Sequence, residues 1–203
     1  MKSFVRFAAV AALLTAGDAW LSGSPGSPAV AAAPGETALP SGVTLGGTFT
    51  LMDQSGRAVT DRDLRGRWSL LYFGYTSCPD VCPTELQTMA EALDSLGPNL
   101  AGQVQPIFVT VDPERDTPER LADYVKLFHP RLMGLTGTPA QVAQAARAYR
   151  VYYAKARPGD GDAYLMDHSS FVYLLDPEGA VRALFRPGTT ADDLAAALRR
   201  RLV

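Results

Sequence analysis

Two nearly continuous apolar runs in the middle of the chain predict buried β-strands. The first covers Trp68–Phe73 and stops at Gly74, and the second covers Ile107–Val111. Short runs without polar alternation are typical of strands that are covered on both faces. A stretch with helical spacing of apolar residues follows each run, at Pro83–Leu96 and at Pro118–Phe128. The order strand, helix, strand, helix therefore predicts a parallel strand pair joined by a right-handed crossover.

Predicted helix starts share one layout, a small polar residue followed by proline. Thr117 and Thr138 each suit the N-cap, because the proline that follows suits the first helical position. The second of these starts a predicted helix at Pro139–Tyr149. Cys82 precedes Pro83 in the same layout, so we expect Cys82 to cap the helix that begins at Pro83.

Turn residues between apolar segments predict two β-hairpins. The turn Asp53–Gly56 belongs to a hairpin near the N-terminus, and the turn Asp176–Gly179 connects Phe171–Leu175 with Val181–Phe185. A final helix, capped by Thr190, follows the second hairpin. This order predicts an α/β fold, namely a single thioredoxin-like domain with a central mixed sheet flanked by helices and an N-terminal hairpin extension.

Composition and charge fit one exported globular domain. The 203 residues are 47% apolar, which is enough for one core, and a net charge of −2 gives no electrostatic footprint for nucleic acid. Lys2 and Arg6 precede an apolar run, so we expect residues 1–21 to be a signal peptide or, preferably, an uncleaved membrane anchor. Residues 22–38 are rich in Ser, Gly, Pro and Ala and predict a flexible linker, which leaves residues 39–203 for the folded domain.

The chain has two cysteines, Cys78 and Cys82, in the hexapeptide Cys-Pro-Asp-Val-Cys-Pro after the first buried strand. Because a residue before proline is pushed out of the helical region, we expect the pair on a loop at the strand end. A cap position near unpaired backbone N–H groups would stabilise the thiolate of Cys82. The pair suits thiol redox chemistry or metal binding better than a structural disulfide, because a disulfide across so short a loop stabilises a fold little.

His168 is the third candidate residue of the site. It lies just before Phe171–Leu175, and an antiparallel arrangement of that strand beside Trp68–Phe73 would place the imidazole next to the cysteines. Two thiolates and one imidazole suit copper, whereas an iron–sulfur cluster or a structural zinc ion needs four ligands. Asp80 and Asp167 are the carboxylates next to these residues, and they are candidates for a fourth ligand or for orienting the ligands.

Three motifs together resemble the Sco/SenC family. They are the cysteine hexapeptide Cys78–Pro83, the segment Val111–Pro118 with the pattern Val-Asp-Pro-x-Arg-Asp-Thr-Pro, and Asp167–Ser169 with the pattern Asp-His-Ser. The likeness covers the chain from Leu39 to Leu202. It implies a thioredoxin-like domain that is tethered to a membrane by its N-terminal segment.

The resemblance also implies a function. It implies one copper ion, as Cu(I) or Cu(II), bound by Cys78, Cys82 and His168, and delivery of that copper to the dinuclear copper centre of cytochrome c oxidase subunit II. An upstream copper donor or a thiol reductant would be a further partner, and the bacterial periplasm, at the inner membrane, is the expected location. The expected protein is a metallochaperone and not an enzyme. The alternative is a thiol–disulfide reductase of that subunit, with Cys78 and Cys82 as its redox-active pair.

Two enzyme classes with related folds fit the residues less well. Thioredoxin-type oxidoreductases have two residues between the cysteines and a cis-proline before the facing strand, whereas this chain has three residues there and no proline in Asp167–Ser170. Peroxiredoxins have a threonine three residues before the reactive cysteine, and Tyr75 occupies that position here. The polar segment Asp112–Pro118 is explained by a rigid turn that leads into a helix cap.

Overall fold

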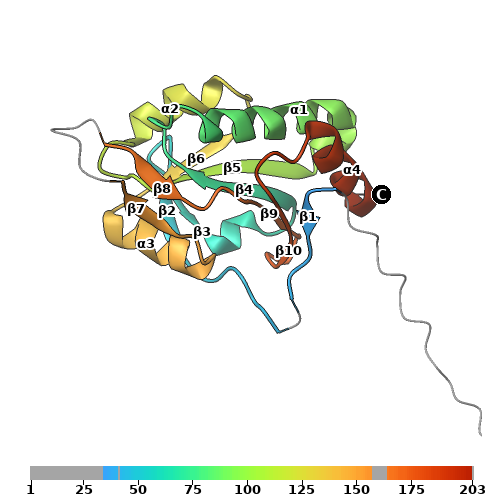
Figure 1. Ribbon diagram of the computed structural model, residues 1–203, viewed down its shortest axis with the longest axis horizontal. Coiled ribbons are helices and arrows are strands. Elements are labelled where there is room, and N and C mark those ends of the chain that lie inside the picture. The colour runs from blue at the N-terminus through green and yellow to red at the C-terminus, as the bar shows by residue number, and fades with distance from the viewer. Residues whose placement is uncertain (1–33, 41, 157–163, 203) are drawn as a thin grey trace, which may run out of the picture.

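An eight-stranded mixed sheet crosses the centre of the molecule in the computed structural model, which describes residues 34–40, 42–156 and 164–202 (Figure 1). In spatial order its strands are β1 (Glu36–Thr37), β10 (Val181–Phe185), β9 (Val172–Leu175), β4 (Trp68–Gly74), β5 (Val104–Thr110), β6 (Met133–Thr136), β2 (Thr50–Asp53) and β3 (Ala58–Thr60). β5 pairs in parallel with β4 and β6, and the other neighbouring strands are antiparallel. The predicted α/β class, mixed sheet and parallel strand pair are confirmed.

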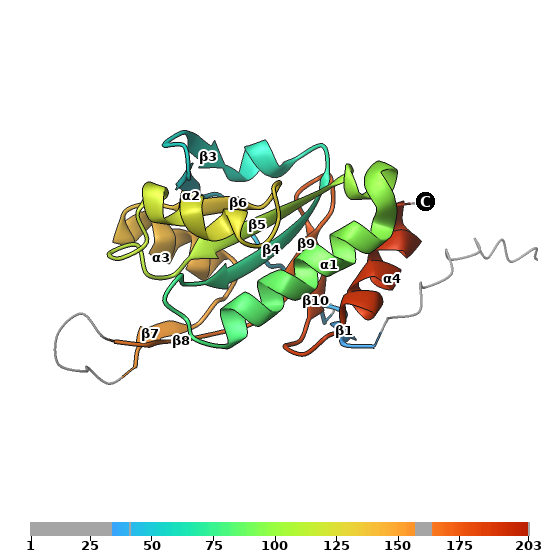
Figure 2. The same cartoon turned by 90° about the horizontal axis from the view of Figure 1, so that it is seen from above.

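Helices cover both faces of this sheet. They are α1 (Val81–Ala101), α2 (Pro118–Lys126), α3 (Pro139–Ala148) and α4 (Ala191–Leu202), and a short 3-10 helix (Asp61–Leu64) follows β3. In Figure 1, α1, α2 and α4 lie above the sheet and α3 lies below it, and Figure 2 shows α1 and α4 side by side. The predicted caps are confirmed, because Thr117 accepts the N–H of Arg120 and Thr138 forms a capping box with Gln141.

β4 is the central strand of the core, which explains its continuous apolar sequence. Leu70 and Tyr72 are fully buried, because the strand has neighbours on both edges and is covered on both faces. β9 runs antiparallel beside β4, and Tyr72 lies opposite Val172, the first residue of β9. The start of β9 therefore lies next to the end of β4, as the sequence predicts.

β6 and a separate ribbon of β7 (Tyr153–Lys155) and β8 (Met166–His168) are not predicted by the apolar pattern. β6 has four residues, and a Cβ atom at its Gly134 would lie 3.0 Å from a methyl group of Val125 in α2. β6 therefore has a glycine where α2 packs against it, and this glycine interrupts the apolar pattern by which the strand could be recognised in the sequence. The ribbon strands have three residues each, which is too short for a recognisable alternation.

The N-terminal part of the predicted domain differs from expectation in two details. The N-terminal hairpin of β2 and β3 forms, but it belongs to the main sheet because β2 also pairs with β6. The folded chain begins before residue 39, since β1 pairs with β10 and Glu36 forms ion pairs with Arg200 and Arg201 of α4. These partners lie 164 and 165 residues away in the sequence, so local composition could not reveal them.

The targeting segment predicted for residues 1–21, and the linker up to residue 33, lie outside the described residues. Within the part that the structure describes, no helix is both long enough and apolar enough to cross a bilayer.

Candidate metal centre

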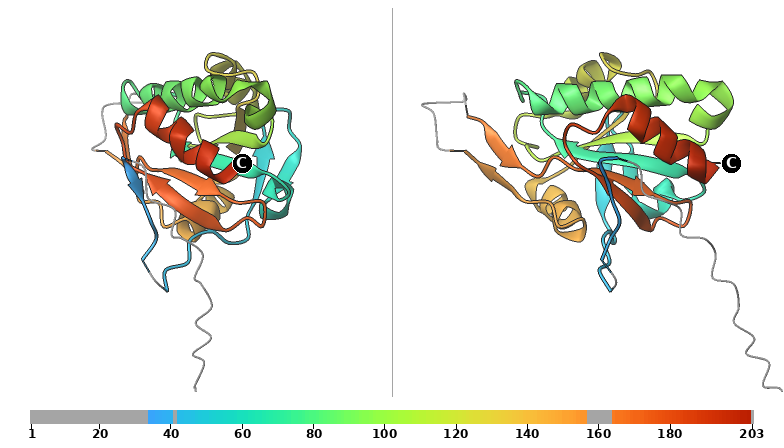
Figure 3. Two further views of the ribbon diagram at one scale, coloured as in Figure 1. Left: turned by 90° about the vertical axis from the view of Figure 1, so that its right-hand side faces the viewer. Right: turned by 45° about the vertical axis from the view of Figure 1, so that its right-hand side comes forward.

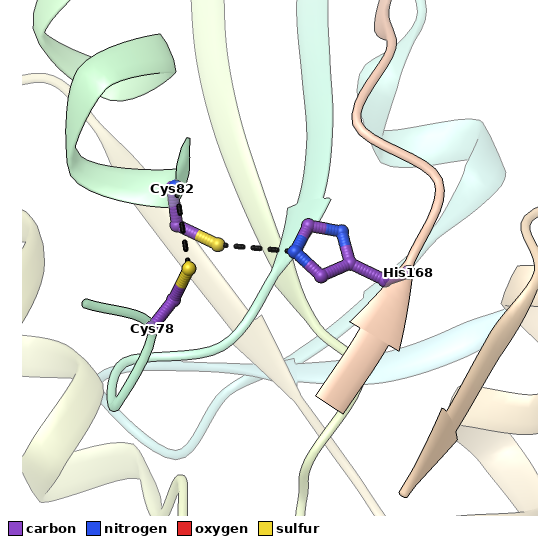
Figure 4. A group of neighbouring side chains, drawn as sticks. All are labelled: Cys78, Cys82 and His168. Atoms are coloured by element: carbon purple, nitrogen blue, oxygen red, sulfur yellow. Dashed lines mark hydrogen bonds between the residues drawn. The ribbon is translucent and has the colours of Figure 1, made fainter. Parts of the chain in front are cut away.

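Two sulfur atoms and one imidazole nitrogen meet at the end of β4 (Figure 4). The ligand atoms of Cys78, Cys82 and His168 all lie within 4.8 Å of one another, and the Cys82 Sγ is 3.3 Å from His168 Nε2. Cys78 comes from the loop after β4, Cys82 from the first turn of α1, and His168 from the end of β8. The structure thus brings together all three residues that the sequence singled out.

The predicted cap position of Cys82 is wrong. α1 begins at Val81, with Asp80 in the cap position, so Cys82 is the second helical residue. Pro83 is then the third, and a proline there loses no hydrogen bond because the first backbone N–H groups of a helix have no partner inside it. The N–H of Cys82 donates to the Cys78 Sγ at 3.4 Å. It is therefore the sulfur of Cys78 that faces the helix start.

At its other end, α1 extends beyond the predicted end at Leu96. Gly97 has φ 75° and ψ 164°, which interrupts the helical conformation before a last turn to Ala101. The left-handed φ suits glycine, and the predicted end lies where this break occurs.

The two thiols have opposite acidities, which reverses the expectation that Cys82 is the activated one. Hydrogen bonding from the Cys82 thiol lowers the pKa of Cys78 well below its ordinary value, with a further contribution from the backbone N–H groups of Asp80 and Cys82. The same interaction with Cys78, together with burial, raises the pKa of Cys82. Cys78 is partly exposed and Cys82 is fully buried. The reactive thiolate is therefore Cys78.

A backbone carbonyl sets the tautomer of His168. The Nδ1 atom lies 3.0 Å from the carbonyl oxygen of Ser169, which can only accept, so Nδ1 carries the proton. Nε2 then presents its lone pair to the sulfur atoms, as a metal ligand must. Tyr72 and Tyr75 pack edge-on against the imidazole, at 6.2 and 5.8 Å between ring centroids, and restrict its orientation. The role of the Ser169 carbonyl has no signal in the sequence, because any residue supplies one.

Gly74, the last residue of β4, makes room for the Cys82 sulfur. A Cβ atom at this position would lie 2.8 Å from Cys82 Sγ and 2.9 Å from Phe108 Cε2. Both distances are shorter than van der Waals contact, so a larger residue would displace the sulfur or the ring. In the sequence Gly74 is recognisable only as a strand end, since a close approach between residues distant along the chain leaves no local pattern.

The supporting role predicted for Asp80 and Asp167 stays a prediction. Both residues are exposed, and Asp80 makes no side-chain hydrogen bond to the start of α1. The carbonyl oxygen of Asp80 accepts hydrogen bonds from the N–H and the hydroxyl of Thr84.

The donor set fits a soft metal ion that is exchanged. Thiolate ligands select Cu(I), and imidazole with thiolate also suits Cu(II). Sulfur ligands bind at about 2.3 Å and imidazole nitrogen at about 2.0 Å, so one ion can reach all three atoms after a small adjustment. Cys82 must lose its proton when the ion binds, so binding releases protons and depends on pH. With three protein ligands, of which Cys78 and His168 are partly exposed, an incoming ligand can reach the ion.

Alkylation of the reduced, metal-free protein should modify Cys78 and spare Cys82. Because the pKa of Cys78 is lowered, we expect its rate constant with iodoacetamide to change by less than about twofold between about pH 6 and pH 8. An ordinary thiol with a pKa near 8.5 becomes about tenfold more reactive per pH unit over this range. Peptide mass spectrometry after brief labelling measures both the site and the rate. The Cys78→Ser variant should label slowly, and preferential labelling of Cys82 in the unmodified protein would contradict the assignment.

Gly74→Ala should weaken copper binding, because the added methyl group occupies the space of the Cys82 sulfur. We expect the dissociation constant for Cu(I), measured by competition with a chromophoric chelator, to rise about tenfold or more. Gly47→Ala is the matched control, since its Cβ atom would meet only the Cβ atom of Ala148, at 3.4 Å. Equal affinities for the two variants would show that the sulfur moves aside without cost.

Comparisons with known proteins find similar sequences and the same fold. The family model described as SCO1/SenC matches residues 37–203. The mitochondrial SCO1 homolog 1 of Arabidopsis thaliana is 50% identical over 134 residues, and the mitochondrial SCO2 homolog of Homo sapiens is 48% identical over 159 residues. These matches cover 66% and 77% of this chain but only 40% and 59% of the two relatives.

Solved structures show the same fold. The structure of Bradyrhizobium japonicum ScoI with copper bound superimposes with a TM-score of 0.72 at 46% identity, over 77% of this chain and 98% of that one. The predicted thioredoxin-like arrangement is confirmed by this match. From the family model and these relatives, the chain belongs to the SCO1/SenC family.

Proposed function

We propose that this protein binds one copper ion through Cys78, Cys82 and His168 and delivers it to the dinuclear copper centre of cytochrome c oxidase subunit II. The observation that carries the proposal is the convergence of two sulfur atoms and the Nε2 atom within 4.8 Å. Copper in the ScoI structure from Bradyrhizobium japonicum, at 46% identity, supports copper as the cargo. The choice of subunit II follows from the resemblance of the three sequence motifs to the family.

The geometry suggests how copper is bound and released. Cys78 is already a thiolate and partly exposed, so it is the first ligand that an incoming ion meets. The lone pair of His168 Nε2 is available without a change of tautomer, and only Cys82 has a proton to lose. Release reverses this order: a ligand of the acceptor approaches from the side of Cys78 and replaces the protein's ligands one by one. Copper therefore passes by ligand exchange and is never free in solution.

The proposal includes a location and partners. We place the domain in the bacterial periplasm, held at the inner membrane by residues 1–21, because a basic start followed by an apolar run is typical of an export signal or anchor. An upstream copper donor loads the site, or a thiol reductant keeps its cysteines reduced, since thiols in an oxidising compartment otherwise form a disulfide.

Thiol–disulfide exchange is the second candidate function, and the opposite acidities of the cysteines favour it. The Cys78 thiolate would attack a disulfide of the partner and release one partner thiolate. Cys82 would then lose its proton and attack Cys78 in the mixed disulfide, which releases the second partner thiolate and leaves a Cys78–Cys82 disulfide. The partner gains two electrons, and the dithiol of this chain supplies them.

His168→Ala separates the two functions, because the imidazole is a copper ligand but forms no covalent bond in disulfide exchange, which needs only the two thiols. We expect the variant to bind Cu(II) about 10- to 100-fold more weakly and to lose the thiolate-to-Cu(II) charge-transfer band, as measured by titration and absorption spectroscopy. Its rate of reducing a model disulfide should stay within about threefold of the unmodified protein, since both thiols remain.

His129→Ala is the matched control for this variant. His129 is the other histidine of the chain and accepts the N–H of Arg131, on a part of the molecule that supplies no ligand. The control should leave the charge-transfer band unchanged. An unaltered Cu(II) band in His168→Ala would refute the three-ligand site.

Deletion of the protein in its host tests delivery. We expect the deletion strain to lose the optical and paramagnetic signals of the dinuclear copper centre while subunit II is still made, and added copper to restore them at least in part. A strain that carries only Cys78→Ser should behave like the deletion. Rescue by an added thiol reductant, and not by copper, would favour the reductase function instead.

A further inference from the structure

The segment from Asp112 to Arg120, here called the bridging segment, does more than turn the chain into α2. It follows β5 and contacts both loops that carry metal ligands: the cysteine loop after β4 and the β7–β8 ribbon. A turn and a helix cap require none of these contacts.

One half of the bridging segment holds the cysteine loop. Asp116 is fully buried, and its carboxylate accepts the N–H of Thr76 at 3.0 Å and the Thr76 hydroxyl at 2.5 Å. Arg120 donates from Nε to the Thr76 hydroxyl at 2.7 Å and from Nη2 to the Ser77 hydroxyl at 2.9 Å. The two residues directly before Cys78 are thus fixed through their backbone and side chains.

The other half holds the ribbon that ends in His168. Asp112 is buried and accepts the Tyr164 hydroxyl at 2.7 Å and the Arg115 Nε at 2.5 Å. Arg115 also donates from Nη1 to the Tyr164 carbonyl at 2.9 Å, and its guanidinium carbon lies 3.7 Å from the centre of the Tyr164 ring. Tyr164 comes two residues before β8, whose last residue is His168.

A second set of contacts also holds the β7–β8 ribbon to the bridging segment. Lys155 of β7 donates to Glu114 at 2.6 Å, and its ammonium group lies 4.4 Å from the centre of the Tyr164 ring. The ribbon projects from the body of the molecule (Figure 3), and the main sheet does not include it. Its position therefore depends on these side-chain contacts as well as on the connection to β9.

The main sheet alone does not set the distance between the ligands. It fixes Gly74 at the end of β4 and Val172 at the start of β9, but Cys78 and His168 each lie four residues beyond these points. Segments of that length have many conformations unless other contacts select one. We propose that the bridging segment sets the separation of the sulfur atoms from the imidazole, with Asp116 and Arg120 positioning Cys78 and with Asp112 and Arg115 positioning His168.

The two halves of the bridging segment should then affect the affinities for Cu(I) and Cu(II) differently. Cu(I) is soft and is held mainly by the thiolates, whereas Cu(II) requires the imidazole as well. Loosening the ribbon should weaken Cu(II) binding selectively, and loosening the cysteine loop should weaken the binding of both ions. This inference rests on the proposed copper binding by Cys78, Cys82 and His168.

Tyr164→Ala tests the ribbon side in the purified protein, since it removes the hydroxyl from Asp112 and the ring from Arg115 and Lys155. We expect the dissociation constant for Cu(II) to rise about tenfold and that for Cu(I) to change by less than about threefold. Tyr152→Ala is the control, because Tyr152 lies next to the same ribbon and is 64% exposed. It should change neither constant.

Arg120→Met tests the cysteine side, since it removes the hydrogen bonds to Thr76 and Ser77 and keeps an aliphatic side chain. The dissociation constants for Cu(I) and Cu(II) should both rise about tenfold. Lys126→Met, on the same helix, removes only an exposed ion pair with Asp123 and is the control.

A metal-free measurement keeps this inference separate from the proposed function. In nitrogen-15 NMR spectra of the reduced protein, Tyr164→Ala should shift the imidazole signals of His168 and leave the amide signal of Thr76 in place. Arg120→Met should do the reverse. Equal losses of Cu(I) and Cu(II) affinity in Tyr164→Ala, or unmoved His168 signals, would overturn the inference. Failure of the unmodified protein to bind copper would overturn the proposed function alone, because the metal-free spectra would still decide the positioning role.

Discussion

The antiparallel pairing of β4 with β9 is the constraint on which the site depends. β4 delivers the cysteine loop at its carboxyl end, and β9 begins directly after the segment that carries His168. Tyr72 lies opposite Val172, so the end of β4 and the start of β9, about a hundred residues apart in the sequence, lie side by side. Buried strands resist a change of register because a slip of one residue would turn every side chain to the opposite face. The ends of these two strands therefore have fixed positions. Only the few residues between each strand end and its metal ligand need further contacts to position them.

Much of this arrangement could be predicted from the sequence because it depends on strong local signals. The apolar run of β4 and the Thr-Pro helix starts identify elements without knowledge of their partners, and the motif residues Cys78, Cys82 and His168 follow from their places relative to the strands. What could not be predicted depends on contacts between distant residues. The Ser169 carbonyl sets a tautomer, and Glu36 pairs with the last helix, but neither leaves a pattern in its own neighbourhood.

The assignment of the activated thiol shows how a local rule can mislead. A cysteine followed by proline resembles the threonine caps of α2 and α3, yet α1 starts one residue before Cys82. That shift turns the N–H of Cys82 toward Cys78 and exchanges the roles of the two sulfurs. This arrangement of the two cysteines suits both candidate functions. A partly exposed thiolate can meet a metal ion or a disulfide, and a buried thiol behind it can act as second ligand or as resolving group.

The close approach of the Cys82 sulfur to Gly74 divides the ligands into one stationary and two adjustable groups. With the backbone of the central strand behind it, the sulfur has no room to retreat when an ion arrives. Cys78 and His168 are held through side-chain contacts of a loop and a ribbon, which leave more room for adjustment than the backbone of β4 does. Cys82 thus serves as the reference point of the centre, and the small movement that coordination requires is made by the other two ligands.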